Sequence, residues 1–211
     1  MKSWIKFIKF FQQPFRDKRG KILKKIYPDF MSLKILDLGG SESFWIESNI
    51  DINPKNITIL NIKNYQNEYS KLPGIKKLTY DGNKIPFEDK SYDLVICNSV
   101  IEHVEKKQRI NFSKEIKRVG KKFFLQTPSF YFPIEPHFVL PFIHWLPKKI
   151  GYYFLHISPW KILGKPDKKT TNEYFFNTNL LRENELVDLF GNSKIYKERF
   201  LGLTKSYIFY S

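Results

Sequence analysis

The stretch Lys34-Ile-Leu-Asp-Leu-Gly-Gly40 is the clearest structural signal in this chain. It has the length and composition of a short buried strand, and two glycines follow it at once. Similar apolar runs occur at residues 57–60, 76–80, 93–97 and 121–126, separated by polar, helix-compatible stretches. Strands that alternate with helices predict a parallel sheet with crossover connections.

Each of these five runs ends in a glycine or a polar residue. The residues in question are Gly39, Asn61, Asp81, Asn98 and Thr127. Open parallel sheets bind their ligands at the carboxyl ends of the strands. We therefore expect a binding site where these five ends meet.

The last part of the chain predicts a different kind of strand pairing. A helix is expected over residues 105–119 and a shorter one up to Gly191, because both stretches end at a glycine. Two strands then follow at 194–200 and 206–210, and the connection of residues 201–205 is too short for a helical crossover. The expected fold is α/β, a mostly parallel seven-stranded sheet with a C-terminal antiparallel hairpin.

Length and composition limit the classes of protein that remain. The chain has 211 residues and a mass of 25.3 kDa, which fits one domain with a small appendage. Its single Cys97 excludes an internal disulfide, and no Cys/His cluster has zinc-ligand spacing, so no metal is expected. The net charge of +15 suggests a polyanionic partner: nucleic acid, an anionic membrane or a phosphorylated substrate.

Two short segments carry most of this charge. Residues 1–25 hold nine Lys and Arg against one acid, and residues 145–170 hold six against one. In the first segment a helical wheel puts Lys2, Lys6 and Lys9 opposite an apolar face, which suits either a membrane interface or packing on the domain. The second segment mixes lysines with aromatics, and could be a lid, a membrane contact, a nucleic-acid surface or an insertion with inward-packed aromatics.

These patterns give an expected domain organisation. Residues 1–30 form a basic amphipathic extension, and residues 31–211 form the main domain with a helical, aromatic and basic insertion at about 138–170. No apolar run is long enough to span a bilayer, and the N-terminus lacks the pattern of a secretory signal. We expect a cytoplasmic protein, peripheral on the inner face of the cell membrane. The sequence gives no indication of the oligomeric state.

Several motifs, in order and at compatible spacing, resemble those of class I S-adenosylmethionine-dependent methyltransferases. Residues 35–39 are similar to the first motif, 81–87 with 91–94 to the adenine loop and fourth strand, and 98–104 to the motif after that strand. The resemblance implies a Rossmann-like fold with S-adenosylmethionine as cofactor. The cofactor-binding residues that it implies are Asp37, Gly39, Gly40, Ser41, Asn61, Asp81, Gly82, Asn98 and Ser99.

The chain departs from that family pattern at two places. Ser41 and Ser43 stand where the second and third motif glycines are usual, and Asn61 replaces the acid that normally holds the ribose. The segment 126–137 resembles bacterial type-11-like methyltransferases that often accompany cell-surface polysaccharide genes. Members of that subgroup also carry a double glycine and an Asn at these positions.

The acceptor side offers three residues for catalysis. Methyl transfer depends mainly on orientation, and a base is needed only where the acceptor must lose a proton. His103 and His137 are the candidate bases, and Glu135 could orient His137 or bind the acceptor. For each of them a purely structural role stays open.

The sequence therefore predicts a methyltransferase that acts on a polar acceptor, a hydroxyl of a glycan or lipid-linked saccharide. Residues 1–25 and 145–170 are the expected contacts with an anionic membrane. A non-catalytic scaffold of the same fold is the first alternative, and a small-molecule or nucleic-acid methyltransferase is the second. Asn98-Ser-Val-Ile101 lacks the Asn/Asp-Pro-Pro-Tyr/Phe pattern expected for base methylation, which argues against nucleic acid.

Overall fold

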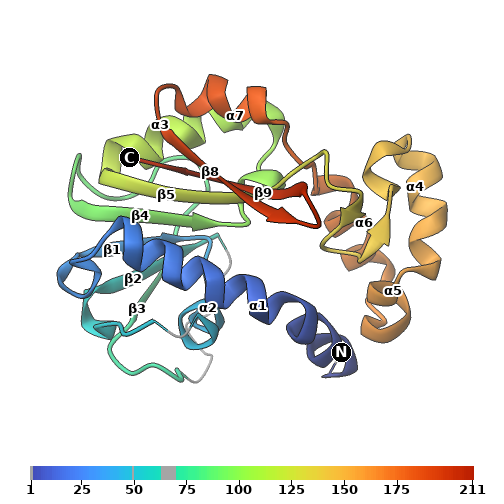
Figure 1. The fold of residues 1–211 in the computed structure, drawn as a ribbon, viewed down its shortest axis with the longest axis horizontal. Helices are drawn as coiled ribbons and strands as arrows, with labels where there is room; N and C mark the ends of the chain where they lie inside the picture. Colours follow the sequence, from blue (N-terminus) through green and yellow to red (C-terminus); the bar gives the residue numbers. More distant parts are fainter. Residues whose placement is uncertain (1, 49, 63–69) are drawn as a thin grey trace.

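A computed structural model describes residues 2–48, 50–62 and 70–211, with side chains from Gln13 onward. Its centre is a seven-stranded sheet of order β3-β2-β1-β4-β5-β9-β8 (Figure 1). The strands are β1 (Ile35–Leu38), β2 (Ile57–Asn61), β3 (Lys76–Thr79), β4 (Tyr92–Asn98), β5 (Gly120–Pro128), β8 (Lys194–Phe200) and β9 (Leu203–Tyr210). The first five are parallel, and β9 runs antiparallel to both β5 and β8. The predicted fold class is confirmed.

Helices cover both faces of this sheet (Figure 1). One face carries α3 (Arg109–Val119) and α7 (Glu183–Phe190), and the other carries α1 (Lys2–Ile26) and α2 (Glu42–Glu47). Strands β1 and β4 are almost fully buried because they lie between these layers. That burial explains why they read as continuous apolar runs rather than alternating ones.

The C-terminal half of α1 packs on the domain. Leu23 is fully buried in the core cluster under this face of the sheet. Buried Arg19 pairs with Glu198 of β8, with 3.1 Å between Nε and Oε2. The apolar face predicted for residues 2–11 lies outside the described side chains.

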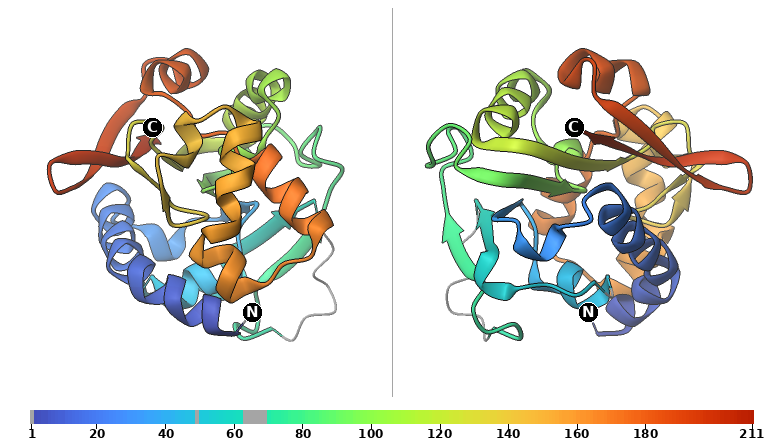
Figure 2. Two further views of the ribbon diagram at one scale, coloured as in Figure 1. Left: turned by 90° about the vertical axis from the view of Figure 1, so that its right-hand side faces the viewer. Right: turned by 60° about the vertical axis from the view of Figure 1, so that its left-hand side comes forward.

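A small unit follows β5 and lies beyond the carboxyl ends of β4 and β5 (Figure 2). It contains a two-stranded ribbon, β6 (Ile134–Glu135) with β7 (Leu140–Pro141), and then α4 (Lys148–Phe154), α5 (Pro159–Gly164) and α6 (Lys168–Asn177). It has a core of its own, made of Phe138, Ile143, Leu155, Trp160 and Phe175. The helical part extends to Asn177, seven residues past the expected end of the insertion.

Two local predictions differ from the structure. The turn of the final hairpin is Leu201-Gly202 alone, with φ of +49° and +80°, so β9 already begins at Leu203. Such a two-residue turn with positive φ matches the twist of the flanking strands. The β6–β7 ribbon and α2 were not predicted. Within the described residues no helix is long and apolar enough to span a membrane.

Candidate functional site

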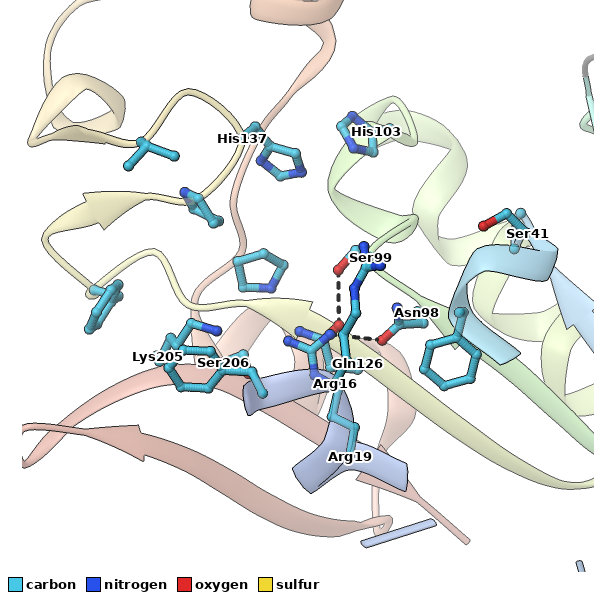
Figure 3. Close-up of a pocket in the computed structure, with 18 of the residues that line it drawn as sticks. Arg16, Arg19, Ser41, Asn98, Ser99, His103, Gln126, His137, Lys205 and Ser206 are labelled. Atoms are coloured by element: carbon cyan, nitrogen blue, oxygen red, sulfur yellow. Dashed lines mark hydrogen bonds between the residues drawn. The ribbon is translucent and has the colours of Figure 1, made fainter. Parts of the chain in front are cut away.

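A cavity of about 520 Å³ opens at the carboxyl ends of the parallel strands. Its walls come from α1, the turn after β1, the ends of β4 and β5, the β6–β7 ribbon, α5, α6 and the final hairpin. Figure 3 shows Ser41 at one side of this pocket, Lys205 at the other, and His103 and His137 together along a third. Of the five predicted strand ends, the parallel topology brings Gly39 and Asn98 into this pocket, whereas Asn61, Asp81 and Thr127 lie outside its described lining.

Asp37 lines this pocket at the end of β1 and is almost fully buried. Its Oδ2 accepts a hydrogen bond of 2.8 Å from Nε1 of Trp45, while Oδ1 has no partner among the described residues. Burial raises the pKa of Asp37 to about 7, and the Trp45 hydrogen bond only partly offsets this. A buried carboxylate oxygen without a partner suits a cationic ligand group.

Gly39 and Gly40 form a tight turn against this carboxylate. Gly39 has φ of +73°, and a Cβ there would lie 2.7 Å from Val100. A Cβ on Gly40 would lie 2.0 Å from both carboxylate oxygens of Asp37. Both positions thus require glycine, and the backbone of the turn is open to close approach by a ligand.

The remaining residues predicted for the cofactor fall into two groups. Ser41, Asn98 and Ser99 line the pocket. The other three, Asn61, Asp81 and Gly82, lie outside its described lining. Nδ2 of Asn61 donates to the Gly40 carbonyl at 2.8 Å, so Asn61 braces the glycine turn and keeps its Oδ1 for another partner. Asp81 is exposed, and hydrogen bonds from Asn83 lower its pKa.

A hydrogen-bonded group fixes the floor of the pocket at the ends of β4 and β5 (Figure 3). Ser99 donates from Oγ to Oε1 of Gln126 at 2.9 Å, and Arg19 donates from Nη1 to Oδ1 of Asn98 at 3.2 Å. Gln126 is fully buried, and its Nε2 has no partner among the described residues. Ser99 has φ of +56°, a conformation that few non-glycine residues adopt.

His137 is held firmly by Glu135. Its Nδ1 lies 2.6 Å from Oε1 of Glu135, whose Oε2 accepts the backbone N–H groups of His137 and Phe138. Burial lowers the pKa of His137, but the carboxylates of Glu135 and Glu102 outweigh burial, so the net pKa is raised. The carboxylate of Glu135 thus orients the imidazole.

His103 lies next to His137 at the same side of the pocket. The two ring centroids are 4.9 Å apart, and Tyr174 stacks on His103 at 5.5 Å. Burial, together with the charge of His137, lowers the pKa of His103 to about 4. His103 is therefore neutral near pH 7.

Some pocket residues were not predicted from the sequence. Arg19 and Lys205 come from α1 and β9, far from the motifs in the chain. Burial lowers the pKa of Lys205 to about 7, and the charge of Arg19 adds to this. Glu102 is fully buried beside His103, and only its place in the motif at 98–104 could have pointed to it.

Comparison with known proteins agrees with this geometry. Residues 37–123, less than half of the chain, match a family model described as a methyltransferase domain. Among curated proteins, none matches this sequence. The family match supports methyl transfer by a class I methyltransferase, and S-adenosylmethionine is the cofactor that it implies.

Solved structures resemble the whole fold. A protein from Pyrococcus horikoshii superposes with a TM-score of 0.52 at 18% identity, over 92% of this chain and 88% of the other. A SAM-dependent methyltransferase from Archaeoglobus fulgidus gives 0.53 at 12% identity, over 95% and 97%. One from Thermotoga maritima gives 0.51 at 14% identity, over 96% and 91%. At these identities the likeness shows a Rossmann-like methyltransferase fold.

Proposed function

We propose that this chain transfers the methyl group of S-adenosylmethionine to a polar acceptor, a hydroxyl of a glycan or lipid-linked saccharide. One observation carries the proposal: a single pocket contains both Asp37 with its glycine turn and the oriented His137. The first end suits the cofactor and the second suits an acceptor that must lose a proton. A methyl transfer needs both ends in one cavity, because its rate depends on placing the two reactants in line.

The residues at the first end fit the cofactor. Unpartnered Oδ1 of Asp37 would receive the ammonium group, and the Gly39–Gly40 turn would let the backbone approach the methionine part. The amide oxygen of Asn61 has no hydrogen bond from the described residues and would accept from a ribose hydroxyl, and Asp81 would accept from the adenine amino group. Ser41, Gly82, Asn98 and Ser99 complete the set that we propose around the cofactor.

When bound, the cofactor supplies a sulfonium methyl group with a good leaving group. The protein orients the acceptor and provides a place for its proton. In the neutral form of His137, Nδ1–H is donated to Glu135 and Nε2 carries no hydrogen, so this pocket-lining residue can accept that proton. Phe132 and Trp160 also line this pocket and supply apolar aromatic surface for an acceptor.

Replacement of His137 tests the acceptor end separately from the cofactor end. H137A should lower turnover at least a hundredfold, because a positioned proton acceptor contributes about 10²–10⁴-fold. Calorimetry with S-adenosylmethionine and S-adenosylhomocysteine should show unchanged affinity. The control is H156A, which removes an exposed histidine in the 3-10 turn after α4. Unchanged turnover in H137A would remove His137 from the proposal, and no cofactor binding by the wild type would overturn the proposed function and favour a scaffold.

The acceptor class needs an experiment in cells. Mass spectrometry of surface glycans and lipids from cells with and without the gene should reveal a species that is lighter by one CH₂ group when the gene is absent. Loss of methylation from a small soluble metabolite instead would contradict the saccharide proposal.

We also propose that the protein binds an anionic membrane surface through the insertion. Ile150, Tyr153, Phe154 and Ile157 follow helical spacing on one face of α4 and the turn after it, and all are exposed. Exposed lysines lie in the same unit: Lys148, Lys149, Lys165, Lys168 and Lys169. The other basic segment is near, because α1 contacts α5 (Figure 1). Apolar side chains flanked by lysines suit an anionic lipid surface.

A further inference from the structure

Glu102, His103 and His137 meet at the acceptor end of the pocket. Glu102 and His103 belong to a single turn of 3-10 helix (Ile101–His103) after β4, and His137 belongs to the loop between β6 and β7. One possible ligand atom from each residue lies within 4.8 Å of the other two. Sequence spacing could not reveal this group, because His137 follows His103 by a whole helix and strand.

The hydrogen bonds around His137 leave one ring nitrogen open. Its Nδ1 lies 2.6 Å from Glu135, whose other oxygen already accepts two backbone N–H groups. Nδ1 therefore carries the hydrogen, and Nε2 has a free lone pair. Metal-binding histidines in proteins are commonly held by a carboxylate in this way.

A hydrogen bond also fixes which ring nitrogen of His103 carries the hydrogen. Its Nδ1 lies 3.3 Å from Oγ1 of Thr178, and that hydroxyl donates its own hydrogen to the Tyr174 carbonyl at 2.7 Å. Thr178 can thus only accept from the ring, so Nδ1 of His103 carries the hydrogen. Nε2 of His103 then also has a free lone pair.

Glu102 completes the group with a buried oxygen that lacks a partner. Its Oε2 accepts from the Thr127 hydroxyl at 2.9 Å, whereas Oε1 has no hydrogen bond within the described part of the chain. The side chain is fully buried, and Oε1 lies 3.8 Å from Nε2 of His137. A carboxylate oxygen left in such a place is costly unless a cation balances it.

We propose that Glu102, His103 and His137 bind one divalent transition-metal ion through Oε1 and the two Nε2 atoms. A proton on His137 would face Oε1 across 3.8 Å, which is too long for a hydrogen bond, and would leave His103 unused. A metal ion with bonds of about 2.1 Å to each ligand spans that distance. Two imidazoles with one carboxylate favour ions such as Zn²⁺, Fe²⁺ or Co²⁺ over Mg²⁺.

The site would assist the proposed methyl transfer, and this consequence rests on that proposed function. Three protein ligands leave coordination positions open, and both histidines line the pocket. An acceptor hydroxyl bound there has a lowered pKa and loses its proton to water. The oxygen then forms a bond to the methyl carbon, the S–CH₃ bond breaks, and its electron pair stays on sulfur. With the metal bound, Nε2 of His137 holds the ion; it takes the proton itself only in the metal-free protein.

Cobalt titration tests the site without reference to activity. Wild-type protein freed of metal by a chelator should bind one equivalent of Co²⁺ per chain, with visible absorption bands, and Zn²⁺ should displace it. E102Q keeps the shape and the Thr127 contact but loses the charge, and H103A removes a ligand. Both variants should bind Co²⁺ at least tenfold more weakly, while H156A should bind like wild type.

The outcomes separate this site from the proposed function. Absence of saturable Co²⁺ binding by wild type, or wild-type affinity in both E102Q and H103A, would overturn the metal site. Should the variants fail to fold, the ring proton signals of His103 and His137 in wild type must shift with paramagnetic Co²⁺; unshifted signals would overturn it too. Calorimetry of metal-free wild type with S-adenosylmethionine tests the methyltransferase itself, so that the two proposals can fail independently.

Discussion

Asp37 combines a cost in stability with a role in binding. Its carboxyl is buried, one of its oxygens has no partner among the described residues, and its folded-state pKa of about 7 lies well above the unfolded value of 3.8. Between pH 3.8 and about pH 7, the Asp37 carboxyl therefore keeps its proton in the folded chain, whereas it has lost that proton in the unfolded chain. Burial of the charged form destabilises the fold progressively from about pH 4 to pH 7. The ammonium of the cofactor is the group that would balance it.

Replacing this residue should separate the two effects. D37N keeps an acceptor for Trp45 but has no charge, so its free energy of unfolding should exceed that of wild type by roughly 2–4 kcal/mol above pH 7 and by little at pH 4. Urea denaturation at both pH values measures this. D93N is the control, because Asp93 in β4 pairs with Lys121 and its pKa is lowered. A less stable D37N at pH 8 would contradict the prediction.

Cofactor affinity should follow the same titration. The ammonium group needs the carboxylate form of Asp37, so affinity should rise between pH 6 and 8 and level off above that range. Cys97 is also a titratable group beside Asp37, but burial raises its pKa well above its usual range, so it stays neutral over this interval. Calorimetry at pH 6, 7 and 8 should show affinity increasing about tenfold in wild type and flat in D37N. A flat wild-type profile would exclude Asp37 as the partner of the ammonium.

At the level of helices and strands, burial explains which elements the sequence predicts. Strands β1 and β4 read as apolar runs because helices cover both of their faces. By contrast, α2 has six residues, too few for a helical period to stand out. In the β6–β7 ribbon each strand has two residues, which is too short for an alternating pattern to be recognised in the sequence.

The same reasoning applies to the pocket. Parallel strands bring their carboxyl ends to one edge, so Asp37, Asn98 and Ser99 could be placed near each other without a structure. Arg19 and Lys205 could not, because α1 and β9 reach the pocket only through tertiary contacts. Buried Leu23 and the buried Arg19–Glu198 ion pair hold α1 on the domain, and that pair is open to a direct test.

The Arg19–Glu198 pair should hold α1 to the final hairpin. Glu198 is buried and also accepts from Ser206, so R19M leaves a buried carboxylate without its cation. The expected loss is about 3 kcal/mol of unfolding free energy. K24M on the same helix breaks the exposed Lys24–Asp51 pair and should cost under about 1 kcal/mol. Urea denaturation measures these losses, and adding E198Q to R19M should recover part of the unfolding free energy. Equal losses of unfolding free energy in R19M and K24M would show that the buried pair does not anchor the helix.

On the scale of the whole molecule, most of the net charge of +15 belongs to two segments that contact each other. The described part of α1 contacts α5, so the two basic segments identified in the sequence come together there (Figure 2). Leu23 and Arg19 are buried in the domain, so deletion of residues 1–25 would remove core contacts as well as charge. Point substitutions in the insertion are therefore the sharper test of membrane binding.

Vesicle flotation with matched variants can decide whether this side binds lipid. Tyr153 and Ile157 are 77% and 64% exposed, and the double variant Y153S/I157S removes apolar area without touching either core. Insertion of two such side chains contributes on the order of 1–2 kcal/mol, so binding to anionic vesicles should fall about tenfold. I110S, at a position on α3 that is 59% exposed, should bind like wild type.

Binding of the wild type should also weaken on neutral vesicles and at high salt, because salt screens the charge of the lysines. Equal flotation of Y153S/I157S and wild type would place the lipid contact elsewhere, and no flotation of wild type would leave the exposed face of α4 for a partner other than a membrane.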